Sequence, residues 1–357
     1  MIRQSTRGEM LVKGVVLLIA ALLLFAPFLF QDIRSLEVAA RICVFIVLVA
    51  SYDLLIGYTG IVSFAHTMFF GFGAYGAAIS LRQMGPGWDA VILGALAGVF
   101  VSLVVAVAIG LLSLRVKAIF FAMITLAAAS VVMVLASQLS QFTGGEDGIT
   151  YKAPDLFKPA TKLAVTEEGK VARLFGVKLN GKLAAYYFVF ASCLVLFVLM
   201  IRLVGAPIGT VLKAIRENEA RAEAIGYRVV AYRTFVFCVA AVIASLAGTV
   251  YAVWLKYTGP DTALSFSIMI DILLMVVIGG MGTMYGAVIG AVLLVLAQYY
   301  LRDLMGSAAE ALANVPLLPF ILEPDRWLFW LGVIFILLVY FFPKGIAGTI
   351  AGKEART

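Results

Sequence analysis

Apolar stretches of similar length follow one another along this chain, and they leave few folds open to it. They fall at residues 12–30, 39–57, 63–81, 89–112, 117–137, 184–204, 233–255, 265–282, 285–302 and 327–343. An α-helix needs about 20 apolar residues to cross a bilayer, and backbone exposed to lipid must form its hydrogen bonds internally. The sequence therefore predicts an all-α membrane protein with about ten transmembrane helices, some of them broken by glycine.

Composition supports this fold class. Of the 357 residues 63% are hydrophobic and 13% are charged, and the mean hydropathy is +1.07. Soluble domains are about half apolar and a quarter charged. In a membrane protein basic residues mostly set topology, so the net charge of +7 does not indicate nucleic-acid binding. We predict a lipid bilayer around the chain and no nucleic acid as a partner.

The distribution of basic residues predicts the orientation. Ten crossings place both termini on one side of the membrane. The short segments on that side hold fourteen Lys and Arg residues, whereas those on the other side hold six. The positive-inside rule assigns the richer side to the cytoplasm. We expect one polytopic membrane domain over residues 1–357, with cytoplasmic N- and C-termini, an outer loop at 138–183 and a cytoplasmic loop at 205–232.

The N-terminus and the cysteines carry no processing or metal signal. Arg3, Arg7 and Lys13 precede an apolar stretch that is longer than a signal-peptide core and lacks a small-residue cleavage site. We therefore predict a retained first helix. The cysteines lie inside apolar runs without metal-ligand spacing, so we expect buried thiols and neither a disulfide nor a metal site. They are Cys43, Cys193 and Cys238.

Two polar segments are expected on the outer side. The loop at 138–183 alternates apolar and polar residues around residues 166–169 and Asn180-Gly181, which indicates a small β-hairpin. A second loop, at about 303–326, contains the run SAAEALAN, which is typical of a short helix at the membrane interface.

Glycine clusters interrupt the apolar pattern twice. The first cluster separates the second and third expected helices, and the other lies between the eighth and ninth. Such breaks permit close helix packing, and they also let free backbone groups line a transport path. The pattern fits both interpretations about equally. The residues that would line a path are Tyr58, Gly60, Ser63, His66, Tyr75, Gly279, Gly280 and Gly282.

Three polar side chains fall inside or beside apolar stretches. Asp53 and Asp271 are candidates for a translocation or proton-relay role, because carboxylates inside a membrane are costly. Near an interface, water or a basic neighbour would satisfy them instead. His66, the single histidine, fits a hydrogen-bonded packing residue better than a metal ligand, since no Cys, Asp or Glu is suitably spaced around it.

Motifs for catalysis are absent from the sequence. It contains no GxxxxGK[ST] phosphate loop, no GxSxG, no HExxH and no Cys/His cluster. We therefore expect no enzyme, no catalytic residue and no cofactor bound by this chain.

The segment TVLKAIRENEARAEAIGYR, from Thr210 to Arg228, is the one long charged stretch between two apolar ones. Its apolar residues recur close to every 3.6 positions, and charges of both signs occupy the other face. Pro207 suits the start of a helix and Gly226 suits its end. The pattern predicts a helix over 210–226 along the cytoplasmic surface. Its mixed charges favour a groove in a partner protein over anionic lipid.

Five motifs run in order along residues 40–348. They are residues 57–60 continuing through 66–75, residues 142–149, residues 213–220 continuing to 226, residues 265–267 continuing through 279–282, and residues 342–348. As a set they resemble the permease subunits of ABC importers for branched-chain amino acids, of the high-affinity leucine, isoleucine and valine type.

The resemblance implies a half-transporter of the bacterial inner membrane that moves branched-chain or related hydrophobic amino acids into the cytoplasm by alternating access. Its partners would be a homologous sister permease, two ATP-binding subunits that hold ATP and Mg, and a periplasmic solute-binding protein. Importers of urea, short amides and aromatic or organic acids have a similar permease. An ion-coupled secondary transporter that uses Asp53 or Asp271 is the alternative from a different class.

The resemblance also assigns roles to residues. The family's Glu-Ala-Ala-x3-Gly pattern is approximated, because Glu219 precedes Gly226 by one residue too many and Glu223 comes too late. Either glutamate is thus a candidate for the docking contact. The coupling helix would include Arg216, Glu217, Asn218, Glu219, Ala220, Glu223 and Gly226. The outer-loop residues that would face the binding protein are Thr143, Gly144, Gly145 and Asp147.

Overall fold

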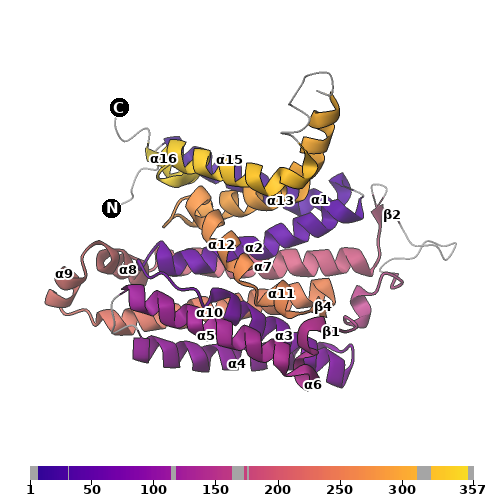
Figure 1. The fold of residues 1–357 in the computed structure, drawn as a ribbon, viewed down its shortest axis with the longest axis horizontal. Helices are drawn as coiled ribbons and strands as arrows, with labels where there is room; N and C mark the ends of the chain where they lie inside the picture. Colours follow the sequence, from indigo (N-terminus) through magenta and orange to yellow (C-terminus); the bar gives the residue numbers. More distant parts are fainter. Residues whose placement is uncertain are drawn as a thin grey trace.

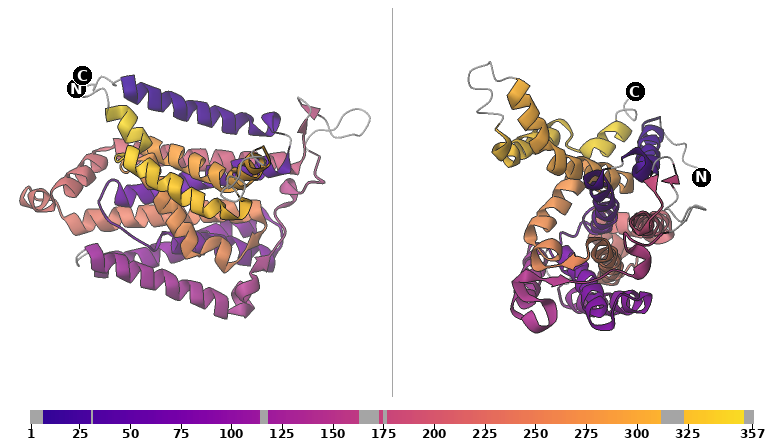
Figure 2. Two further views of the ribbon diagram at one scale, coloured as in Figure 1. Left: turned by 45° about the horizontal axis from the view of Figure 1, so that its top comes forward. Right: turned by 90° about the vertical axis from the view of Figure 1, so that its right-hand side faces the viewer.

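The computed structural model describes residues 7–30, 32–113, 118–162, 173–174, 177–311 and 323–352. Over these residues ten helices of 14 residues or more form one bundle (Figures 1 and 2). They are α1 (Arg7–Leu29), α2 (Ile33–Ile56), α3 (His66–Met84), α4 (Trp88–Ser113), α5 (Ala118–Gln138), α7 (Gly181–Gly205), α10 (Val229–Leu255), α12 (Phe266–Gly279), α13 (Met284–Ala311) and α15 (Trp327–Phe341).

Each expected apolar stretch corresponds to one of these helices. Within the described residues, nine helical segments are long and apolar enough to cross a membrane. The tenth long helix, α3, is less apolar because His66, Arg82 and Gln83 lie near its ends, and it packs against α4 and α10. The prediction of an all-α, multi-span membrane protein is confirmed.

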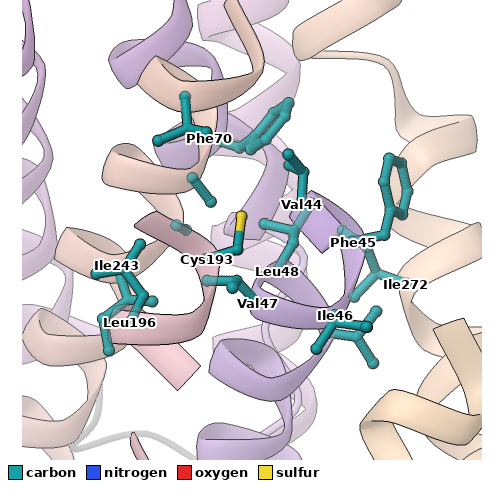
Figure 3. Packing of buried hydrophobic residues seen from close by; sticks show 14 of the residues in the cluster. Val44, Phe45, Ile46, Val47, Leu48, Phe70, Cys193, Leu196, Ile243 and Ile272 are labelled. Atoms are coloured by element: carbon teal, nitrogen blue, oxygen red, sulfur yellow. The ribbon is translucent and has the colours of Figure 1, made fainter. Parts of the chain in front are cut away.

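Helix α2 forms the centre of the bundle. It packs against α7, α10, α12 and α13, and its side chains from Val38 to Leu55 are almost all buried. Figure 3 shows the hydrophobic side chains that meet here and places the Cys193 thiol among them. Cys43, Cys193 and Cys238 are all free and buried, so the prediction of buried thiols is confirmed. The thiols act as small hydrophobic groups in this core.

Short elements mark the two ends of the bundle (Figure 1). At one end, called here the α8 end, lie α8 (Pro207–Glu217), α9 (Glu219–Ala224) and α16 (Gly345–Gly352). At the other, called the β1 end, β1 (Ile149–Thr150) pairs antiparallel with β4 (Tyr257–Thr258). The remaining short elements are α6 (Ser140–Thr143), η1 (Gly145–Asp147), η2 (Asp155–Phe157), β2 (Arg173–Leu174), β3 (Val177–Lys178), α11 (Pro260–Ala263) and η3 (Pro324–Arg326).

The described chain begins and ends at the α8 end. Helices α1 and α16 are in contact, and Val12, Ile289 and Ala347 form a small buried cluster between them and α13. This arrangement agrees with an even number of crossings. The assignment of the α8 end to the cytoplasm stays a prediction from the distribution of basic residues.

Two expectations for the polar loops need correction. Strands β2 and β3 pair antiparallel, as a small hairpin would. The predicted turn at Asn180-Gly181 is wrong, because the Asn180 side chain accepts a hydrogen bond from the Leu183 N–H at 3.3 Å and caps α7. The predicted turn at 166–169 lies outside the described residues. Residues 307–311 continue α13 and do not begin a separate interfacial helix; the rest of that run is not among the described residues.

Candidate functional site

The charged segment at the α8 end consists of two helices. The prediction of one helix over 210–226 is wrong, because the helix is interrupted at Asn218, where the backbone is extended. The Asn218 side chain accepts a hydrogen bond from the Arg221 N–H at 2.9 Å and caps α9. Asparagine competes with helix continuation in this way and favours a new helix start. The break turns α9 relative to α8, so the segment projects from the bundle (Figure 2).

Both predicted ends of this segment are confirmed. Pro207 occupies the first turn of α8, where its missing N–H costs nothing. At the other end Gly226 has φ +96°, a left-handed conformation that suits glycine. The Gly226 N–H donates to the Glu223 carbonyl and the Tyr227 N–H donates to the Ala222 carbonyl, which is the Schellman arrangement.

The apolar face of the segment is buried against its own chain. Ile215, Ala222 and Val229 form a cluster in which α8 and α9 pack on the start of α10. Ile225, three residues after Ala222, is instead 68% exposed. Glu217, Asn218, Glu219, Ala220 and Glu223 also lie exposed. The segment therefore offers solvent a mixed-charge surface on which Ile225 is the most exposed large apolar side chain.

The two candidate docking glutamates differ in their contacts. Glu219 accepts a hydrogen bond from Arg233 Nη1 at 2.8 Å and forms an ion pair with it. This pair ties the first turn of α9 to α10. Glu223 is exposed, and no ion pair to another described residue involves it. Glu223 is thus the more accessible of the two to a partner.

Arg216 connects the charged segment to the first glycine break. It lies near the end of α8, and its Nη1 donates a hydrogen bond to the carbonyl of Gly57, the residue immediately after α2. The connection between α2 and α3, residues 57–65, is mostly buried although it is irregular. Other elements supply partners for its backbone; for example, the Phe64 N–H donates to Thr125 Oγ1 of α5 at 3.0 Å.

Asp53 connects the first glycine break to the second. Its Oδ1 accepts a hydrogen bond at 2.8 Å from the N–H of Gly282, in the turn between α12 and α13. The positive charge of Arg216 also attracts the Asp53 carboxylate. Asp53, Gly57, Arg216 and Gly282 are called the junction below. The structure thus brings the charged segment and both glycine breaks to one point at the α8 end.

Glycine is required at two positions of the junction. A Cβ on Gly57 would overlap the Asp53 carboxylate and the Gly282 amide nitrogen. Gly282 has φ +81°, and a Cβ there would lie 2.8 Å from both Arg216 Nη1 and the Gly57 carbonyl oxygen. Only the absence of side chains lets the two connections and the guanidinium approach this closely.

A cavity of about 410 Å³ opens beside the junction. Tyr58 and Gly282 line it, together with Lys13 of α1 and Lys213 of α8. The Lys213 ammonium lies 5.3 Å from the centre of the Tyr58 ring, within the range of a cation–π contact. Of the predicted path residues, Tyr58 and Gly282 therefore border open space at this end.

The other predicted path residues lie in packed surroundings. Ser63 and His66 are fully buried, and His66 Nε2 lies 2.8 Å from Ser51 Oγ. Because that hydroxyl donates to the Leu48 carbonyl at 2.8 Å, His66 Nε2 is the donor of the pair. The remaining members are Tyr75, 7% exposed, Gly279 and Gly280, both buried, and Gly60, which is exposed near Arg216.

Asp271 lies apart from the junction. It is half-buried in α12, and its polar neighbours are Gln298 and Arg41. The structure therefore separates the two intramembrane carboxylates that the sequence singled out together. Asp53 belongs to the α8 end of the bundle, and Asp271 belongs to a second polar group around Arg41.

The loop at residues 143–148 forms a tight glycine turn at the β1 end. Thr143 Oγ1 donates to the Ala136 carbonyl at 2.6 Å and accepts from the Gly145 N–H at 3.3 Å. Gly144 and Gly145 both have positive φ, of 75° and 67°. The Asp147 carbonyl accepts from the Tyr257 hydroxyl at 3.1 Å, which holds the loop against β4 and leaves the Asp147 side of the turn exposed.

The sequence identified the parts of this site but not how they join. Arg216 was expected in the charged segment, Asp53 inside or beside an apolar stretch, and the glycines at the breaks. The bonds from Arg216 to Gly57 and from Gly282 to Asp53 were not expected. A polytopic helical bundle in which a charged surface segment reaches two glycine-broken connections is the architecture of a membrane transport component.

Sequence similarity to known proteins supports the assignment to this class. Residues 35–341 match the family described as branched-chain amino acid transport system, permease component. The chain is similar to the high-affinity branched-chain amino acid transport system permease protein LivM of Salmonella typhimurium and of Escherichia coli. These are 27% and 26% identical to it over 322 residues, or 88% of this chain and 75% of each relative. The chain therefore belongs to the branched-chain amino acid permease family of ABC importers and is a multi-pass protein of the bacterial inner membrane.

A third relative covers less of the chain. The probable branched-chain amino acid transport permease protein LivM of Methanocaldococcus jannaschii is 30% identical over 173 residues, which is 47% of each chain. No solved structure matches the chain.

Proposed function

We propose that this chain is one permease of an importer that moves branched-chain or related hydrophobic amino acids into the cytoplasm by alternating access. A homologous sister permease would complete the passage, and a periplasmic solute-binding protein would deliver the substrate to the β1 end, near Asp147. Two ATP-binding subunits would hold ATP and Mg and would supply the energy. Urea, short amides and aromatic or organic acids are the alternative substrates.

The junction is the observation that carries this proposal. In an importer of this kind, movement of the ATP-binding subunits must reach the transmembrane helices. Arg216 lies on the exposed segment, and its guanidinium bonds to the connection at Gly57, which is held to Gly282 through Asp53. A displacement of α8 would therefore act on the ends of α2, α3, α12 and α13 together. In this proposal α8 and α9 form the coupling segment, and the α8 end faces the cytoplasm.

Purification of the tagged chain from its native membrane in mild detergent, with mass spectrometry of associated proteins, tests this function. We expect a second permease and ATP-binding subunits in stoichiometric amounts. A chain recovered alone in several mild detergents would instead favour an ion-coupled transporter that uses Asp53 or Asp271. In that case a protonophore would abolish uptake at constant ATP.

Ile225 is expected to contribute to docking of the ATP-binding subunit. It is 68% exposed beside the charged side chains of α9, and burial of an isoleucine side chain in a partner groove stabilises a complex by roughly 1.5–3 kcal/mol. Ile225→Ser should weaken retention of the ATP-binding subunits about tenfold, since each tenfold change in affinity corresponds to about 1.4 kcal/mol. The affinity is measured by titrating the isolated subunit onto the permease in nanodiscs.

A matched control separates docking from nonspecific hydrophobic association. Leu304, in the last part of α13, is 63% exposed and lies outside the coupling segment. Leu304→Ser should leave retention unchanged, and neither variant should alter the unfolding temperature of the chain. Equal retention by Ile225→Ser and the wild type would exclude Ile225 from the docking surface.

A further inference from the structure

A second cavity, of about 340 Å³, lies at the β1 end among α2, α7, α10 and α13. Three basic side chains, Arg41, Lys182 and Lys256, line it with one acidic side chain, Glu37. Trp254 and Phe157 contribute aromatic surface to the same cavity. Its volume falls in the range of about 300–1,000 Å³ that is typical of small-molecule sites. The junction and the proposed coupling segment lie at the other end of the bundle.

The positive charge in this cavity is compensated only in part, by Glu37 on its wall and by Asp271, whose charge acts on Arg41. No ion pair among the described residues involves Lys182, Lys256 or Glu37. Burial, and to a smaller extent repulsion from Lys182, lower the pKa of the Lys256 ammonium. Two lysines that repel each other beside a third cation are stabilised when an anion binds between them. The cavity is therefore suited to a negatively charged group.

Arg41 is held in position before any ligand arrives. Its Nη1 donates to the Tyr299 hydroxyl at 3.0 Å, and its guanidinium carbon lies 5.0 Å from the Phe45 ring centre and 5.4 Å from that of Tyr299. Its Nε is buried and has no hydrogen-bond partner among the described residues. A buried donor without a partner favours binding of an acceptor. A planar guanidinium fixed between two rings is suited to a carboxylate.

The backbone at Lys256 is unusual for its residue type. Lys256, the residue immediately after α10, has φ 60°, and it is the only non-glycine residue with positive φ among the described residues. A left-handed conformation costs a residue with a Cβ roughly 1–2 kcal/mol, and such outliers cluster at ligand sites. Here the conformation coincides with a lysine that lines the cavity. Lys182, which also lines the cavity, lies in the first turn of α7, where the positive end of the helix dipole also favours an anion.

We propose that this cavity binds a single free aliphatic α-amino acid, with its carboxylate toward Arg41, Lys182 and Lys256 and its ammonium toward Glu37. The side chain of the ligand lies against Trp254 and Phe157. Because the cavity has both signs of charge and an apolar wall, it suits a zwitterion with an aliphatic side chain better than a simple anion. The identity of the ligand rests on the proposed amino-acid transport. The location of the site within one permease chain does not depend on a sister subunit.

Binding of radiolabelled L-leucine to the full-length chain in phosphatidylcholine nanodiscs tests the proposal. We expect saturable binding, at least tenfold weaker binding of leucinamide, which lacks the carboxylate, and weaker binding of 4-methylpentanoate, which lacks the ammonium. Lys182→Gln and Lys256→Asn should each reduce leucine affinity five- to tenfold. Asparagine is chosen at position 256 because it tolerates the left-handed conformation. Lys152→Gln, which removes an exposed lysine outside the cavity, should leave binding unchanged.

Glu37→Gln provides the sharpest comparison. It should weaken binding of leucine severalfold and leave binding of 4-methylpentanoate unchanged, because only leucine carries the ammonium. Absence of saturable leucine binding by the wild type, or equal binding of leucine and leucinamide, overturns the proposal. So does a result in which the lysine variants lose bound phosphatidylglycerol in native mass spectrometry but retain leucine, since the cavity is then a lipid site. If the partner subunits co-purify while leucine binding fails, the pocket alone is rejected and the importer stands.

Discussion

Replacement of Arg216 by alanine is expected to reduce substrate uptake at least tenfold while the ATP-binding subunits remain bound and hydrolyse ATP. The Arg216 guanidinium is the group that joins α8 to the connection after α2. A hydrogen bond from a charged donor contributes about 1.5–3 kcal/mol, which is enough for a tenfold effect on a coupled equilibrium. Without it, α8 can move without displacing Gly57. Uptake and ATP hydrolysis, measured in the same proteoliposomes, give the coupling ratio directly.

A second variant and a control make the result specific. Arg216→Lys keeps the charge but loses the planar fork, so we expect partial recovery of uptake. Arg202→Ala removes an exposed arginine from the last turn of α7 at the same end of the bundle, and its coupling ratio should equal that of the wild type. Uptake by Arg216→Ala within twofold of the wild type, at equal expression, would rule out this arginine as the mechanical link.

Most of the fold could be predicted because membrane helices have a strong local signal. The apolar stretches predicted all ten long helices, since backbone in lipid has few alternatives to a helix. The predicted limits were less accurate where a helix extends beyond the membrane. Helix α13 continues to Ala311 because Leu, Met, Ala and Glu, which favour helices, make up most of residues 303–311, although this stretch is polar for a membrane span.

Two errors, the turn predicted at Asn180 and the single helix predicted over 210–226, came from asparagine. Asn180 before a glycine resembles a hairpin turn, and Asn218 lies inside an amphipathic pattern. In the structure each side chain accepts a hydrogen bond from the backbone N–H three residues later and caps a helix. The same side chain supports turns and helix caps, so the outcome depends on how the neighbouring residues pack in the folded chain. The periodicity of apolar residues alone could not detect the break at 218.

The junction could be predicted only in part. A carboxylate near a membrane span and glycine clusters in both halves of the chain were visible in the sequence. That Asp53 binds the Gly282 N–H depends on a contact between residues 229 positions apart, which no local pattern encodes. The same limit applies to the cavity at the β1 end, because Arg41, Lys182 and Lys256 come from three different helices or their ends.

The role of Asp53 is expected to depend on its hydrogen bond and not on its proton. Its Oδ1 accepts from the Gly282 N–H at 2.8 Å, and asparagine retains an oxygen at this position. We therefore expect Asp53→Asn to keep uptake within about threefold of the wild type. Asp53→Leu should lower uptake more than tenfold, because it leaves the part-buried Gly282 N–H without its partner, and such a loss costs about 1–3 kcal/mol. Uptake is measured in proteoliposomes at equal protein content.

The same pair of variants separates the two classes of transporter. An ion-coupled transporter that protonates Asp53 would lose uptake equally in Asp53→Asn and Asp53→Leu, because neither side chain titrates. In the importer, the asparagine variant retains the tie between the two glycine breaks, and ATP continues to drive the cycle. Glu9 is an acidic side chain that lines the cavity at the α8 end, and Glu9→Gln tests whether loss of any negative charge there is enough to reduce uptake. Equal and severe loss of uptake in both Asp53 variants, with Glu9→Gln unaffected, would reject the junction as a structural link and favour a proton site.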